Sequence, residues 1–182
     1  MVVDQNFLKV KKYFLLVIFF LLFASKSYSN NYTFTKIIEL DEPWGSSFIN
    51  NNEIIITEKS GKIKIVNVIS KEVTEIKHNL NFLEVGQGGL LDIIHQDNAL
   101  WISYSEDRGN LKTSTSIAKA QLNKQELNFK NIFQANPPID SGYHFGSRLA
   151  IKDDYIYASA GERGQGMIAQ DPTKHPGSII RI

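Results

Sequence analysis

Three similar segments recur along the chain and restrict the folds that it can adopt. Each follows a polar turn, consists mainly of β-branched or other apolar residues, and is followed by a glutamate. Their spacings are 46 and 56 residues. Repeats of about 40–50 residues with about four strands each are typical of β-propeller blades. A β-sandwich also contains regularly recurring strands, but the constant order of turn, strand and glutamate favours the propeller. The segments are IIIT at 54–57, LWIS at 100–103 and IYAS at 156–159, and the glutamates are Glu58, Glu106 and Glu162.

The rest of the chain after residue 29 also predicts β structure. Short β-branched or aromatic runs alternate with turn residues, and no apolar residues recur at helical spacing. The fold class is therefore all-β, with about three units of four strands in residues 30–182. Ordinary propellers close with about four to eight blades, so we expect an incomplete arc that is the N-terminal part of a longer protein. The predicted strands are 54–57, 62–68, 100–104, 116–122, 127–133 and 155–159.

Residues 1–29 have the features of a secretory signal peptide. Lysines precede a continuous apolar run at 13–24, and Ser27 and Ser29 stand at the −3 and −1 positions of a cleavage site. The run has 12 residues, whereas a helix that spans a bilayer needs about 20, so we expect export rather than a membrane anchor. Removal of this segment leaves 16 basic and 18 acidic residues and no cysteine. This composition suits a bacterial periplasm and gives no electrostatic argument for nucleic-acid binding.

Three short motifs carry polar side chains at positions where chemistry is possible. VGQGGLLD at 85–92 places Gln87 among glycines before an apolar strand, GERGQG at 161–166 follows a strand, and HFGSRL at 144–149 places a histidine at a strand entrance. Taken singly, each motif is more often structural, although an imidazole can accept a proton near neutral pH. The other histidines show no metal-ligand spacing, and zinc-protease and serine-hydrolase motifs are absent from the sequence.

The order of these motifs resembles the glucose/sorbosone dehydrogenase family, and within it the soluble aldose sugar dehydrogenases that use pyrroloquinoline quinone (PQQ). The resemblance extends from about Leu40 to Ile182. GQGGLLD and HFGSRL are its most specific parts. The motifs in order are PWGSSFI (43–49), TEKSGKIKIV (57–66), GQGGLLDI (86–93), WISYSE (101–106), HFGSRLAI (144–151), GERGQ (161–165), AQD (169–171) and HPGSIIRI (175–182).

The resemblance implies a six-bladed propeller in the full protein, with PQQ on the axis and a calcium ion that polarises the quinone. It implies that His144 is the general base that takes the anomeric proton of an aldose while hydride leaves C1 for C5 of the quinone. The product is the lactone. The resemblance also matches Gln87 to a glutamine that hydrogen-bonds in the cofactor pocket, and it places Arg163 near the sugar. We expect Arg148 to anchor a blade, and we expect the calcium ligands beyond residue 182, with no metal ligand in this chain.

Two departures from the family pattern bear on the substrate. Some glucose-oxidising relatives carry an aspartate where this chain has Tyr143, and the usual GDRG is GERG here. We therefore expect an aldose pocket that is broader than, or different from, one for glucose; the electron acceptor is unknown. A lactonase-type propeller hydrolase and a non-catalytic binding propeller remain alternatives.

Overall fold

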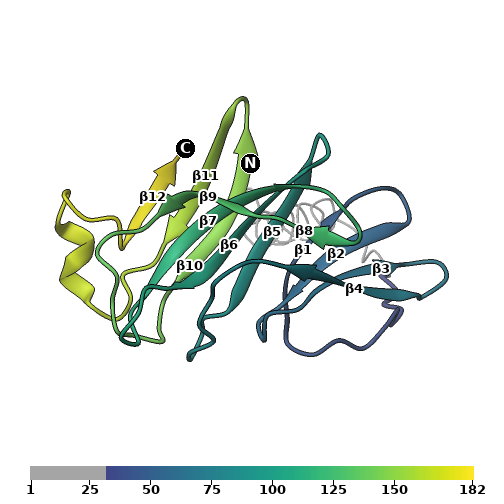
Figure 1. The fold of residues 1–182 in the computed structure, drawn as a ribbon, viewed down its shortest axis with the longest axis horizontal. Helices are drawn as coiled ribbons and strands as arrows, with labels where there is room; N and C mark the ends of the chain where they lie inside the picture. Colours follow the sequence, from purple (N-terminus) through teal and green to yellow (C-terminus); the bar gives the residue numbers. More distant parts are fainter. Residues whose placement is uncertain (1–31) are drawn as a thin grey trace, which may run out of the picture. The chain divides into compact units, whose positions relative to one another are not determined.

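The computed structural model describes residues 32–182, in which Lys36–Ile182 form one compact unit of β-sheets (Figure 1). The strand orders are β1-β2-β3-β4-β8, β5-β6-β7-β9 and β10-β11-β12. This confirms the all-β class and the division into three successive sheets, and each repeated segment is the second strand of its sheet. The strands are β1 (Pro43–Phe48), β2 (Glu53–Glu58), β3 (Ile63–Asn67), β4 (Val73–His78), β5 (Leu90–Gln96), β6 (Ala99–Asp107), β7 (Thr113–Gln121), β8 (Glu126–Leu127), β9 (Lys130–Gln134), β10 (Gly146–Lys152), β11 (Tyr155–Ala160) and β12 (Ser178–Arg181).

Two apolar clusters pack neighbouring sheets together. One joins the first two sheets and includes Ile55, Ile63 and Leu100, all with exposed fractions of 0%. The other joins the second and third sheets around Ile117 and Leu149. Successive side chains of a strand point to opposite faces, so Ile117 contacts the third sheet while Ala118 of the same strand packs in the first cluster.

The first strands β1, β5 and β10 lie side by side, with β5 between the other two. Each contains a β-bulge near its start, between Pro43 and Gly45, between Leu90 and Ile93, and between Gly146 and Leu149. Bulges re-aim side chains and are frequent next to functional sites.

Hydroxyl groups connect the sheets at these bulges. Thr57 Oγ1 accepts a hydrogen bond from the Gly45 amide (2.9 Å) and donates to the Leu91 carbonyl of the next sheet (2.5 Å). Ser103 Oγ repeats the arrangement, accepting from the Asp92 amide (3.0 Å) and donating to the Ser147 carbonyl (2.6 Å). The repeat in the sequence therefore includes a repeated contact between sheets.

Several of the predictions about strands required correction. The segment predicted as one strand at 127–133 forms two strands, because the Asn79 side chain bonds the amide and carbonyl of Phe129 and takes that residue out of the ladder. The resulting β8 pairs in parallel with β4, so the first sheet gains a fifth strand. Strand β4 and a 3₁₀ helix at Gly166–Gln170 were not predicted, and the third sheet has three strands in the described residues.

The expected signal peptide lies outside the described residues. Between residues 32 and 182, no helix has the length and apolar character that crossing a membrane requires.

Candidate active site

His144 occupies the segment before β10 in an unusual backbone conformation. Its φ angle is +50°, in the left-handed region that non-glycine residues seldom adopt. Its amide donates to Gln87 Oε1 at 2.8 Å, and its carbonyl oxygen lies where only glycine fits at position 161, because a Cβ there would be 1.9 Å from it. Contacts from two other segments therefore hold the backbone of His144.

Gln87 lies in the glycine-rich loop before β5 and is fixed to the same segment through its backbone. Its amide donates to the Gly142 carbonyl at 2.7 Å. Gly86 makes this approach possible, since its φ is +56° and a Cβ would be 2.5 Å from the Gly142 oxygen. The structure therefore brings together Gln87 and His144, which are 57 residues apart in the sequence.

The His144 imidazole is paired with Glu162, the glutamate that follows the third repeat. Nδ1 lies 2.5 Å from Glu162 Oε1, and the side chains are 54% and 28% exposed. The hydrogen bond from His144 lowers the pKa of Glu162, so this carboxylate is ionised at neutral pH. A carboxylate can only accept hydrogen bonds. The Nδ1 atom therefore carries the proton, and the lone pair of the neutral ring is on Nε2.

Arg163 is placed differently from the other candidates, because its side chain is enclosed. The residue is 2% exposed. Its guanidinium donates to the carbonyls of Tyr143 (2.9 Å) and Thr113 (3.0 Å), to the Thr113 hydroxyl (2.7 Å) and to the Ser141 carbonyl. Burial lowers the pKa of Arg163 to about 10, which leaves the group protonated at neutral pH. The expected contact of Arg163 with the sugar remains a prediction.

Arg148 reaches from β10 to the second sheet, as expected of a residue that anchors a blade. Its Nη1 lies 3.1 Å from Asp92 Oδ1, and Asp92 Oδ2 accepts from the Leu149 amide at 2.8 Å. Arg148 and Asp92 border a cavity of about 270 Å³ together with Trp44 and Gly146. All of them come from the first strands of the sheets or their bulges.

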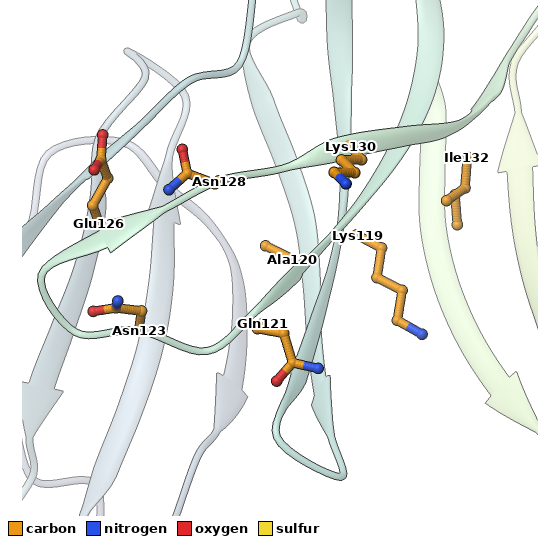
Figure 2. Close-up of a pocket in the computed structure, with 8 residues that line it drawn as sticks. All are labelled: Lys119, Ala120, Gln121, Asn123, Glu126, Asn128, Lys130 and Ile132. Carbon is orange, nitrogen blue, oxygen red and sulfur yellow. The ribbon is translucent and has the colours of Figure 1, made fainter.

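A larger groove of about 500 Å³ lies away from these residues, against β7 (Figure 2). It is formed by β7 and the segment that carries β8 and β9, and neither His144, Gln87 nor Glu162 lines it. Its lining residues are mainly lysines and amides from β7, from β9 and from the segments on either side of β8. The lining residues are Lys119, Ala120, Gln121, Asn123, Glu126, Asn128, Lys130 and Ile132.

Residues 32–182 contain no group of three or more histidine, aspartate or glutamate side chains that could hold a metal ion. The calcium ligands expected beyond residue 182 therefore stay a prediction.

The sequence pattern marks Glu162 as one of the repeated glutamates and does not identify it as the partner of the imidazole. A signal was available in the turn at Asp153–Asp154, which predicts an antiparallel pair of the flanking segments. The observed register joins Gly146 to Ala160, and continuing it by two residues brings 144 opposite 162. The role of Thr113, 50 residues from Arg163, had no such local signal.

The sequence of this chain is similar to those of known proteins. The Glucose / Sorbosone dehydrogenase family model matches residues 40–182. Aldose sugar dehydrogenase YliI of Escherichia coli is 29% identical over 154 residues, which cover 79% of this chain and 42% of that protein. An uncharacterised Synechocystis protein, slr1608, is 30% identical, with 79% and 40% covered. This chain thus spans about two-fifths of the length of these relatives.

Solved structures of aldose sugar dehydrogenases are similar to the structure of this chain. The apo-form of the soluble aldose sugar dehydrogenase from Escherichia coli has a TM-score of 0.74 and 29% identity, covering 79% of this chain and 44% of that one. A PQQ-bound aldose sugar dehydrogenase from Streptomyces coelicolor, at 22% identity, TM-score 0.69 and coverage of 79% and 45%, shares the fold. Because the family model matches residues 40–182 and includes the motifs that surround His144, this chain belongs to the glucose/sorbosone dehydrogenase family.

Proposed function

We propose that the full protein oxidises an aldose at C1 to the lactone with PQQ as cofactor, and that His144 is the general base. The observation that carries this proposal is the 2.5 Å contact between His144 Nδ1 and Glu162 Oε1. A carboxylate on Nδ1 fixes the tautomer in which Nε2 can accept a proton, and it stabilises the imidazolium that forms.

The residues around His144 fit the proposed reaction, because the Gln87 amide nitrogen can donate a hydrogen bond to a quinone oxygen and Nε2 of His144 can accept a proton. Nε2 of Gln87 and Nε2 of His144 have no hydrogen-bond partner among residues 32–182, and both residues are exposed beside Tyr143, which is 61% exposed. When bound, PQQ supplies the two-electron acceptor for the hydride from C1. His144 receives the hydroxyl proton of the sugar, Glu162 balances the resulting charge, and Gln87 both fixes the His144 backbone and offers an amide donor.

Further parts of the proposal concern the whole protein. Family membership and the PQQ-bound relative support PQQ. We extend the proposal to six blades, a calcium ion held by residues beyond 182, a small aldose as substrate, and export to the periplasm through residues 1–29.

The test uses the full-length protein reconstituted with PQQ and calcium, with reduction of an artificial dye by a panel of aldoses as the assay. We expect His144→Ala to lower turnover by about 10²-fold or more, the usual contribution of a general base, while PQQ binding is retained. His95→Ala is the control, because His95 lies on β5 and its ring has no hydrogen-bond partner among the described residues.

Near-full turnover in His144→Ala would remove this residue from the mechanism. Hydrolysis of lactones by the full-length protein without PQQ would support the lactonase alternative. Sugar binding without either reaction would support a binding propeller.

A further inference from the structure

Arg163 is a buried charge for which residues 32–182 provide no carboxylate in ion-pair contact. Burying an ionised group is costly unless hydrogen bonds satisfy it. Four of the five N–H groups of a guanidinium are accounted for here, and every acceptor is a backbone carbonyl or a hydroxyl. Because these partners are neutral, the hydrogen bonds do not neutralise the charge of Arg163. They fix the position of its guanidinium relative to the segments that carry the acceptors.

The side-chain contacts of Arg163 include residues on both sides of His144. The carbonyls of Ser141 and Tyr143 precede the histidine, and the Phe145 ring that follows it packs under the guanidinium at 3.6 Å. The Arg163 amide also donates to the His144 carbonyl at 3.3 Å. One residue therefore contacts the whole segment that holds the imidazole.

The other end of this arrangement is a fixed point on the second sheet. Thr113 begins β7, is 0% exposed, and exchanges two backbone hydrogen bonds of 3.0 Å with Ile139. Arg163 binds both its carbonyl and its hydroxyl. Because Glu162 precedes Arg163 directly, a shift of Arg163 moves the carboxylate and the imidazole segment together.

We propose that Arg163 is a positioning residue that sets the geometry of the His144–Glu162 pair, instead of a residue that contacts the sugar. This inference rests on the proposed function, in which that pair accepts the proton. Bidentate and stacked arginines are poorly replaced by lysine, so Arg163→Lys keeps the charge but loses the fork of hydrogen bonds.

The first measurement uses the full-length protein without cofactor, labelled with ¹⁵N-histidine, so that it is independent of turnover. We expect the Nδ1–H signal of His144, assigned by its absence in His144→Ala, to shift or broaden in Arg163→Lys. Arg181→Lys is the matched control, since Arg181 also lies over an aromatic ring, that of Tyr155, at 4.8 Å. This control should leave the His144 signal unchanged.

The second measurement is steady-state kinetics of the PQQ-reconstituted protein. Displacement of a catalytic group by about 1 Å can lower rates by about 10²-fold, so we expect kcat to fall at least about tenfold in Arg163→Lys, with the KM for the aldose changed less than about twofold. If Arg163→Lys does not fold, Thr113→Val replaces it, because it removes one of the four hydrogen bonds and should shift the same signal by less.

An unchanged His144 signal with a raised KM would overturn the proposal in favour of a sugar contact, and an unchanged signal with unchanged kinetics would also overturn it. If the parent protein oxidises no aldose, the proposed reaction fails while the NMR measurement still decides whether Arg163 positions the pair.

Discussion

Replacement of Thr57 by valine should weaken the contact between the first two sheets without changing the shape of the side chain. Thr57 is 0% exposed, and its hydroxyl is both the acceptor for the Gly45 amide and a donor to the Leu91 carbonyl. The two sheets approach closely at this point, since a Cβ at Gly45 would be 2.5 Å from the Leu91 oxygen. Valine therefore leaves one buried N–H and one buried carbonyl without this partner.

The magnitude follows from the two orphaned groups. A buried polar group left without its hydrogen bond costs about 1–3 kcal/mol, so Thr57→Val should lower the free energy of unfolding of the full-length protein by about 2–6 kcal/mol. Thr57→Ser keeps the hydroxyl and loses one methyl group, so it should cost about 1 kcal/mol. The assay is urea denaturation at equilibrium, followed by tryptophan fluorescence.

Thr74→Val is the matched control, because Thr74 lies on β4 of the same sheet and is exposed. Surface substitutions usually change stability by about 0.5 kcal/mol or less. If Thr57→Val changes the free energy of unfolding no more than this control does, the hydroxyl does not stabilise the junction between the sheets.

Two further predictions concern the candidate site. Gln87→Ala should weaken PQQ or sugar binding by about 1–3 kcal/mol, the cost of an unmade hydrogen bond, as measured by titration calorimetry; loss of folding with normal binding in the folded fraction would make Gln87 purely structural. The pKa of Glu162 is held below its ordinary value of 4.5 by the hydrogen bond from His144, so this group stabilises the fold above pH 4.5 and the stabilisation disappears as the pH falls through the lowered pKa. Urea denaturation should accordingly show Glu162→Gln less stable than the parent protein at pH 7, with the difference shrinking below about pH 4.5; a difference independent of pH would contradict the pairing.

The repeat of strand and glutamate was sufficient to predict the class and the order of the sheets. Alternating side chains on a strand and turn residues between strands are local properties, and they placed β2, β6 and β11 correctly. The same reasoning did not predict that β8 is a separate strand. Its two residues pair with β4, and that pairing depends on Asn79 and on the burial of Leu127 between sheets.

In the candidate site too, local features could be predicted from the sequence, whereas contacts between distant residues could not. The sequence by itself determined that Gln87 and His144 lie in glycine-containing segments at strand entrances, because tight turns require such residues. Only the tertiary structure decided that Glu162 pairs with the imidazole and that Arg163 is enclosed against Thr113. The exposure of an arginine depends on which distant carbonyls and rings surround it. A contact between two residues that are 50 positions apart leaves no periodic pattern in the sequence from which it could be predicted.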